Sequence, residues 1–135
     1  MLSNERMEVF SPSCNVDTVK DGRGGIFTWV PQDKIMEFNL LYFTPATTRG
    51  NHFHPEFVEY FLVVEGSGIA VTRDAPDMKE RIIHISKGSC VRTPIGVTHT
   101  IYAITPLTAV AMLTKPWDDC KDPIIREDIF DSKKK

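Results

Sequence analysis

Two histidines and one glutamate have residue types and a spacing that suit a shared chemical site. His52 and His54 are two residues apart, so on a β-strand both side chains would project from the same face. Glu59 lies five residues beyond His54, which is the wrong parity for one straight strand. Pro55 lies between them and marks a turn that can reset the phase. The glutamate can therefore swing back toward the two imidazoles from the start of the next strand.

A second segment supplies one more imidazole. Pro94 and Gly96 form a tight-turn signal that leads into a strand opening near His99. Three imidazoles and one carboxylate suit Zn, Fe, Ni, Mn or Cu. The sequence therefore predicts a metal site made of His52, His54, Glu59 and His99. The fourth histidine, His84, has no such neighbours and is interpreted as structural.

Short β-forming runs, separated by Gly and Pro, must position these side chains. They are rich in Val, Ile, Phe, Tyr and Thr, and their near-regular spacing predicts an all-β sandwich or barrel with little helix. A short helix is expected only after Asp122-Pro123, where Asp could cap and Pro could open the first turn. The expected strands cover residues 25–30, 37–44, 59–64, 68–73, 80–85, 90–93, 98–105 and 107–114.

Length and charge limit the possible classes of protein. The 135 residues, with 16 Lys+Arg against 18 Asp+Glu, predict one domain over 1–135, with a core at about 21–116 and a C-terminal tail at 117–135. The formal net charge of −2 argues against a nucleic-acid partner. No apolar run is long enough for a membrane span and no leader pattern is visible, so a cytoplasmic protein with no membrane partner is expected. Cys14, Cys90 and Cys120 are interpreted as free thiols.

One expected strand carries information about packing. Residues 60–64 are all apolar, so both faces of the strand require burial. Either the chain itself covers the second face, or a second subunit does. A homodimer is therefore one of the two interpretations and the expected oligomeric state.

The two segments resemble the signature of the cupin superfamily. The first motif matches at His52, His54, Glu59 and Gly66, and the second at Gly88, Pro94, Gly96 and His99. The leading glycine of the first motif is displaced to Gly50, and Ala103 replaces the final asparagine of the second. The resemblance covers residues 50–103. It implies a cupin double-stranded jelly-roll β-barrel with the ligands inside.

A narrower resemblance runs over residues 21–130. The sequences Asp21-Gly22-Arg23-Gly24 and Arg49-Gly50-x-His-x-His are similar to those of cupins that act on nucleotide-linked keto-deoxy sugars. One such group, the nucleotide-sugar 3,4-ketoisomerases, uses its histidines as acid and base without metal. The other, the cupin domain of capsular polysaccharide bifunctional reductase/epimerases, keeps the glutamate and holds zinc, and it looks closer. The resemblance implies an isomerase or epimerase acting on a nucleotide-activated 4-keto-deoxyhexose in surface polysaccharide biosynthesis.

Such a reaction removes a proton beside the ketone, which needs a base and a group that stabilises the oxyanion. A divalent metal would supply the second as a Lewis acid; zinc is expected, with iron, manganese and nickel as alternatives and no organic cofactor. If the metal binds every histidine of the site, the base must be Tyr42, Tyr60, Tyr102 or a bound hydroxide. If the site holds no metal, His52 and His54 form the acid–base pair. The catalytic candidates are therefore His52, His54, Tyr60 and Tyr102.

Substrate-binding candidates flank the histidines. The guanidinium of Arg49 suits a diphosphate through bidentate contacts, and Tyr42 and Arg92 are further candidates. A metal-dependent dioxygenase-type cupin and a non-catalytic small-molecule-binding cupin remain alternatives, because binding and reacting sites share most residue types.

Overall fold

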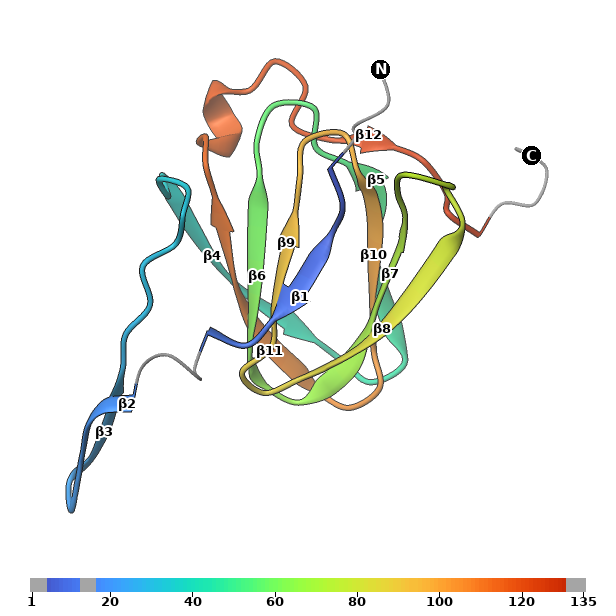
Figure 1. Cartoon of the computed structure of the whole chain (residues 1–135). Helices are drawn as coiled ribbons and strands as arrows, with labels where there is room; N and C mark the ends of the chain where they lie inside the picture. Colours follow the sequence, from blue (N-terminus) through green and yellow to red (C-terminus); the bar gives the residue numbers. More distant parts are fainter. Residues whose placement is uncertain (1–4, 13–16, 131–135) are drawn as a thin grey trace.

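Two antiparallel sheets face each other in the computed structural model, which describes residues 5–12 and 17–130 (Figure 1). In order across the first sheet lie β1 (Glu8–Phe10), β9 (Cys90–Thr93), β6 (Glu59–Glu65), β11 (Leu107–Leu113) and β4 (Glu37–Phe43). In order across the second lie β12 (Ile125–Arg126), β5 (Thr47–Phe53), β10 (Thr98–Ala103), β7 (Ser67–Arg73) and β8 (Glu80–Ser86). A separate hairpin, β2 (Asp17–Asp21) and β3 (Gly24–Phe27), stands away from the barrel.

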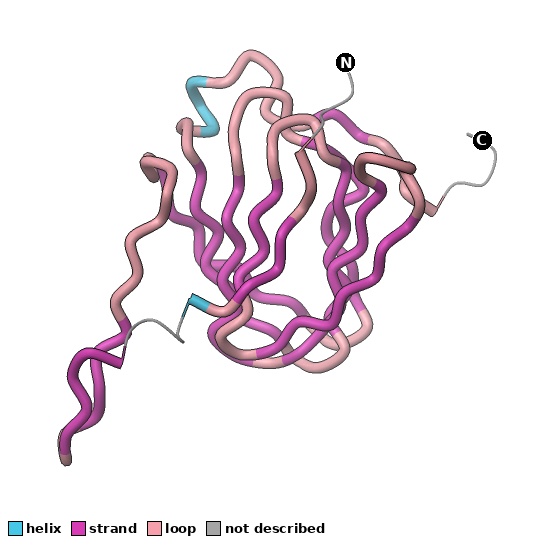
Figure 2. Tube along the Cα trace, viewed as in Figure 1, coloured by secondary structure: helices cyan, strands magenta, loops and turns pink. Residues whose placement is uncertain are grey.

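The all-β prediction is confirmed, and Figure 2 shows a chain of strands and loops. Short 3-10 turns such as Trp117–Asp119 are the helical structure of the described residues, and none of it is long enough to cross a membrane. The prediction of a short helix after Asp122-Pro123 is wrong. Ile125 and Arg126 instead pair with Phe53 and His52 of β5 as strand β12. This pairing with a neighbouring strand overrides a weak local capping signal.

The core lies between the sheets, because alternate residues of each strand face inward. Inward side chains of both sheets form one apolar cluster, which includes Phe43, Phe61, Val63, Ile85, Ile101 and Leu107. Of these, Phe43, Phe61 and Ile101 also line a cavity, so the core forms part of its wall. The two cysteines of the described residues, Cys90 and Cys120, are free thiols as predicted, and Cys14 lies outside the described residues.

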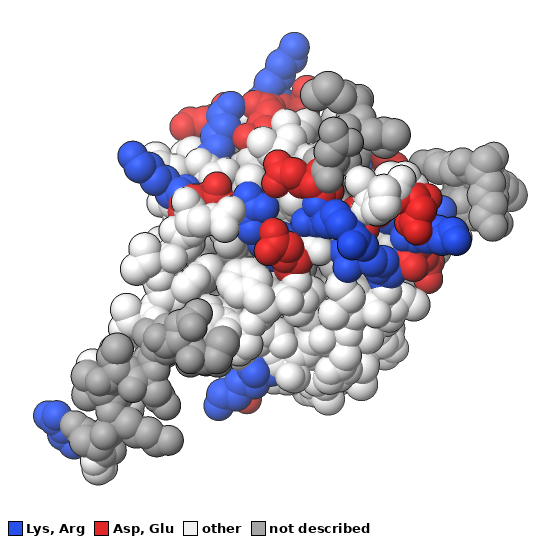
Figure 3. Space-filling model, in the orientation of Figure 1, with Lys and Arg blue, Asp and Glu red and all other residues white. Residues whose placement is uncertain are grey.

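The chain itself covers the second face of the apolar strand. Tyr60 points outward from β6, yet it is 1% exposed. Its ring packs edge-on against Trp29 at 5.4 Å between centroids, and Trp29 contacts Phe10 in the same way. This strand therefore gives no argument for a second subunit. In Figure 3 charged side chains gather toward one end of the molecule, while much of the barrel wall below them is uncharged.

A buried carboxylate joins the N-terminal segment to the loop after β7. Asp74 is 2% exposed and accepts hydrogen bonds from Arg81 Nη2 at 2.6 Å, Arg81 Nε at 2.9 Å and the Met7 backbone N–H at 2.9 Å. Burial raises the pKa of Asp74, but the hydrogen bonds from Arg81 and Met7 and the charges of Arg81 and Arg6 outweigh it. The pKa of this carboxyl therefore lies below its ordinary value.

We expect Asp74→Asn to lower the free energy of unfolding by about 2–3 kcal/mol at pH 7. This is less than the loss for a fully buried pair, because Arg81 is partly exposed. A carboxyl whose pKa is depressed on folding stabilises the fold above its unfolded pKa of ~3.9 and loses that contribution as pH falls. Urea titrations between pH 3 and 7 check this. The gap between wild type and variant should narrow below pH 4, and a gap independent of pH would contradict the assignment.

Candidate functional site

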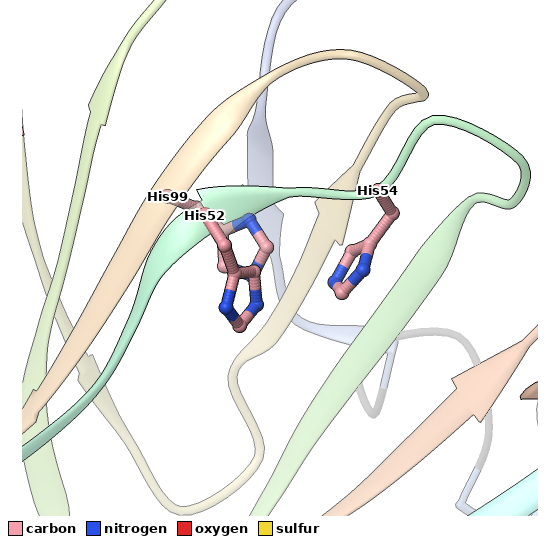
Figure 4. Close-up of side chains that lie close together, drawn as sticks. All are labelled: His52, His54 and His99. Carbon is pink, nitrogen blue, oxygen red and sulfur yellow. The ribbon is translucent and has the colours of Figure 1, made fainter. Parts of the chain in front are cut away.

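Three histidine rings converge inside the barrel, as Figure 4 shows. His52 lies near the end of β5, His54 just after it, and His99 on the neighbouring β10. The ring centroids are 4.8 Å apart for His52 and His54, 4.9 Å for His52 and His99, and 5.0 Å for His54 and His99. One nitrogen from each ring lies within 4.8 Å of the others. The structure thus brings the predicted imidazoles together from two segments far apart in the sequence.

A bulge in β5 aims these side chains. His99 pairs with His52 and Thr100 pairs with Gly50, so Asn51 is an extra residue with no partner across the ladder. Gly50 and Asn51 have φ values of 127° and 55°. The extra residue resets the alternation of faces. As a result Arg49 and His52, three positions apart, both line the same cavity.

The bulge requires a glycine and a polar residue. A Cβ atom at Gly50 would lie 2.6 Å from the carbonyl oxygen of His99 and 2.8 Å from Cα of Thr100. The Asn51 backbone N–H donates to Thr100 Oγ1 at 2.9 Å, and that hydroxyl donates to Asn51 Oδ1 at 2.9 Å. β5 and β10 therefore approach closely at the point where they present His52 and His99.

Glu59 reaches the histidines from the facing sheet. It is the first residue of β6, in the opposite sheet from β5. The alternation of side chains along a single strand therefore does not apply to His54 and Glu59, and no kink in one strand is needed to bring them together. Oε1 of Glu59 lies 3.7 Å from Nε2 of His54 and 3.5 Å from Nε2 of His99. These separations are too long for good hydrogen bonds. They resemble the ~3.3–3.4 Å between ligand atoms that tetrahedral geometry gives for metal–ligand distances of ~2.0–2.1 Å.

Backbone carbonyls assign the histidine tautomers. Nδ1 of His54 lies 3.1 Å from the Pro123 carbonyl oxygen, and Nδ1 of His99 lies 3.4 Å from that of Val97. A carbonyl only accepts, so in a neutral ring these contacts favour the tautomer with the proton on Nδ1 and the lone pair on Nε2. Nε2 of His54 is buried without a hydrogen-bond partner. In this tautomer the lone pairs and the carboxylate face the same point, so the donor set fits a divalent cation.

The electrostatics agree with this arrangement. Burial lowers the pKa of His52 to about 4, and the neighbouring imidazoles of His99 and His54 lower it as well. Burial raises the pKa of Glu59, but the close approach of His54 and His99 lowers it by a larger amount, so the pKa of this carboxyl lies below its ordinary range. His52 is therefore neutral and Glu59 ionised at pH 7. These are the forms in which imidazole and carboxylate bind metals.

The site opens into a cavity of about 210 Å³. This is smaller than the ~300–1,000 Å³ of sites that enclose a drug-sized ligand. Arg49 is exposed, and its guanidinium carbon lies 5.8 Å from the centre of the Phe43 ring. The lining residues are Asn39, Leu41, Phe43, Arg49, Gly50, His52, His54, Glu59, Phe61, His99, Ile101, Ala111, Leu113 and Trp117.

Tyr60 and Arg92 do not reach this cavity. Both project from the outer face of the first sheet, where Arg92 Nε donates to Tyr60 at 3.2 Å and to Asp33 at 3.1 Å. Tyr60 also donates to Asp33. Burial raises the pKa of Tyr60 to about 12, with a further contribution from Asp33. Their expected catalytic and substrate-binding roles at the histidine site are therefore corrected. The two residues anchor the segment before β4 to the barrel.

Tyr42 and Tyr102 are likewise absent from the cavity lining. Tyr42 is 69% exposed, while its strand neighbours Leu41 and Phe43 both line the cavity. Tyr102 follows the inward-facing Ile101 on β10 and so projects from the opposite face. Strand parity therefore excludes both tyrosines as the base and Tyr42 as a substrate contact within this chain.

Three further residues belong to the site. Phe57 is fully buried and stacks on His54, with 4.3 Å between centroids. Trp117 lines the cavity, is 40% exposed, and donates its backbone N–H to Glu37. Asn39 lines the cavity from β4. Asn39 could have been found in the sequence as a polar residue in phase with Leu41 and Phe43, whereas no local signal placed Trp117.

Comparisons with known proteins agree with this architecture. A family model of the polysaccharide biosynthesis C-terminal domain matches residues 19–121. CapF, a capsular polysaccharide assembling protein from Staphylococcus aureus, matches with 25% identity and a TM-score of 0.64 over 81% of this chain and 31% of CapF. The chain thus spans about a third of CapF. A search of curated proteins gave no match.

Two ketoisomerases show the same fold at lower identity. A 3,4-ketoisomerase from Helicobacter canadensis has a TM-score of 0.74 and 15% identity over 90% of both chains. A mutant of the 3,4-ketoisomerase QdtA from Thermoanaerobacterium thermosaccharolyticum, solved with TDP-4-keto-6-deoxyglucose, has a TM-score of 0.70 and 17% identity over 94% of this chain and 90% of that one. The cupin fold expected from the two motifs is confirmed. With its histidine site inside that barrel, the chain belongs to the polysaccharide biosynthesis C-terminal domain family.

Proposed function

We propose that the protein is an isomerase or epimerase that acts on a nucleotide-activated 4-keto-deoxyhexose in surface polysaccharide biosynthesis. The convergence of three imidazoles and Glu59 inside a small cavity carries this proposal. Membership of a polysaccharide biosynthesis family supports it, as do the two 3,4-ketoisomerases that share the fold. The whole chain acts as one cupin domain in this proposal.

Separate roles within the site follow from the distances. His54, His99 and Glu59 would hold a divalent ion, for which we propose zinc; two histidines and one glutamate are a known catalytic zinc set that leaves a position open. When bound, the ion supplies a Lewis acid for the negative charge that develops on the ketone oxygen. Among the described residues, the histidines within 4.0 Å of Glu59 are His54 and His99. His52 was also predicted as a ligand, and its nitrogen lies within 4.8 Å of those of His54 and His99. Because it is the histidine farther from Glu59, we assign it in this proposal to the substrate.

The proton moves through His52 in this proposal. A ring nitrogen of His52 takes a proton from the carbon beside the ketone, and the electron pair of the broken C–H bond forms an enediolate. If water at the opposite face supplies a proton to the same carbon, that centre is inverted, and His52 then releases its own proton to solvent. If His52 instead gives its proton to the former ketone carbon, and the proton of the neighbouring hydroxyl moves to the former ketone oxygen, the ketone migrates. Either outcome restores His52 to its neutral state.

The test supplies dTDP- or UDP-4-keto-6-deoxyhexose to the purified chain in deuterium oxide. Deuterium should enter the sugar ring at a carbon next to the ketone, as seen by mass and NMR spectra. Elemental analysis should find about one zinc per chain. The proposal would be contradicted if no deuterium entered the sugar under any condition, whether zinc, iron, manganese or nickel was added or no metal was present. Oxygen uptake that depends on ferrous ion would favour a dioxygenase instead.

Only the reacting sugar fits the cavity, so the diphosphate must lie at the mouth near Arg49. We expect Arg49→Ala to weaken dTDP binding about 10–100-fold, because a charge-assisted bidentate contact contributes ~1.5–3 kcal/mol. Calorimetric titration with dTDP checks this, with Arg23→Ala on the β2–β3 hairpin as the matched control. Equal affinity of the Arg49 variant and wild type would remove Arg49 from the binding site.

A homodimer stays a prediction, and we propose the outer face of β4 as its surface. Phe38, Leu40 and Tyr42 are 69%, 57% and 69% exposed on this edge strand. Two copies of such a strip can cover each other about a two-fold axis. Light scattering should give the mass of a dimer for wild type and of a monomer for Leu40→Glu. Ile82→Glu, at a 60% exposed residue of the other sheet, should stay dimeric. A monomeric wild type would contradict the proposal.

A further inference from the structure

The segment after the family match runs along the strand that carries the histidines. Residues 122–130, here the C-terminal strap, lie beyond the match at 19–121 and pass beside β5 in Figure 1. Within the strap, Ile125 pairs with Phe53 and Arg126 with His52. The strap thus forms the edge of the second sheet next to the site.

Two hydrogen bonds fasten the strap to the bulge. The Glu127 backbone N–H donates to the carbonyl oxygen of Asn51 at 2.9 Å, and that of Ile129 donates to Asn51 Oδ1 at 3.2 Å. Ile129 is 3% exposed, so its side chain anchors this end of the strap in the barrel. At the other end, Asp122 donates its backbone N–H to Glu56 at 2.7 Å.

Between these anchors the strap contacts a functional side chain. The Pro123 carbonyl oxygen lies 3.1 Å from Nδ1 of His54, a residue that is 2% exposed. Because the carbonyl accepts, it keeps the proton on Nδ1 and leaves the lone pair of Nε2 facing Glu59. If the proton moved to Nε2, that N–H would point toward the Glu59 carboxylate, and the lone pair of His54 would lie on Nδ1, facing the Pro123 carbonyl and away from a cation in the site.

We propose that the C-terminal strap is a positioning element of the site: the Pro123 carbonyl selects the His54 tautomer that can bind a divalent ion. The inference rests on the proposed function for the use of that ion, and it concerns residues that the family match does not include. A hydrogen-bond partner behind a metal-binding histidine typically changes metal affinity by 10–100-fold.

Release of the strap tests this in the full-length protein. Glu127→Pro removes the N–H that reaches Asn51 and alters an exposed side chain, whereas Glu127→Ala keeps the backbone donor. In the metal-free wild type, nitrogen-15 spectra should show His54 with its proton on Nδ1. Glu127→Pro should move this proton to Nε2 and weaken Zn²⁺ binding 10–100-fold in a chelator competition, whereas Glu127→Ala should match wild type.

A second variant, at another position, shows whether the result comes from release of the strap or from the substitution at Glu127 alone. Ile129→Asp places a charge at the buried anchor, and amide exchange of β7 and β10 reports whether the barrel stays folded. If amides 125–129 exchange rapidly in either folded variant while His54 keeps its Nδ1 proton and wild-type Zn²⁺ affinity, the strap is only a cover and the proposal is overturned. The readouts need no sugar substrate, so their failure is distinct from a failure of deuterium incorporation.

Discussion

Replacing His54 by alanine should abolish deuterium incorporation and reduce bound zinc to a trace. His54 supplies one of the nitrogens that face Glu59, and its loss leaves only His99 and Glu59 of the proposed ligand set. Activity should fall by at least ~10³-fold, because it requires both the ion and the geometry it imposes. Zinc content and label incorporation are measured on the same preparation. His84→Ala, at an exposed histidine of β8, is the control and should behave as wild type.

A companion variant separates proton transfer from metal binding. His52→Asn should retain zinc yet lose about 10²–10⁴-fold in label incorporation, the range for removal of a general base. Loss of zinc in this variant would place His52 among the ligands instead. Normal labelling by His54→Ala would contradict the assignment of the site itself.

Gly50→Ala should damage both the fold and the site. The added Cβ would meet the backbone of His99 and Thr100 at 2.6 and 2.8 Å, and the φ of 127° is unfavourable for alanine. Neither obstacle is the end of a flexible side chain, so the strands β5 and β10 must separate. We expect a loss of roughly 2–4 kcal/mol in the free energy of unfolding. Zinc affinity should fall as well, because the same strands carry His52 and His99.

Gly22→Ala is the matched control, since nothing lies within 4 Å of a Cβ added at that turn. Thermal unfolding and zinc titration of both variants provide the comparison. Wild-type stability and zinc affinity for Gly50→Ala would show that the bulge tolerates a side chain and does not set the geometry of the site.

Strand patterns and motif spacing were enough to predict the barrel and its histidines. The expected strand at 37–44 corresponds to β4, and that at 107–114 to β11. Apolar alternation is a local property, so the sequence carries it directly. The predicted proximity of His99 to His52 required only that two strands pair, which the structure shows.

Features that depend on pairing between distant segments were not predictable. The bulge at Asn51 reverses which side chains of β5 face inward. A bulge depends on the partner strand, so the residue pattern of β5 alone does not reveal it. The tyrosine candidates failed because aromatic side chains suit either face of a strand. Tyr60 illustrates this, since Trp29 and Phe10 cover it on the outer face. The strap was not predicted, because its two-residue strand is defined only by its pairing with β5 and leaves no pattern of its own in the sequence.

The origin of the four proposed site residues has a mechanical consequence. Glu59 belongs to one layer of the sandwich, while His52, His54 and His99 belong to the other or follow it directly. An ion bound by residues of both layers would cross-link the two sheets. Its binding would therefore raise the unfolding temperature of the whole molecule. At a hundredfold excess over Kd the gain would be about 2.7 kcal/mol. Removal of the ion by a chelator would then destabilise the entire sandwich and not the cavity alone.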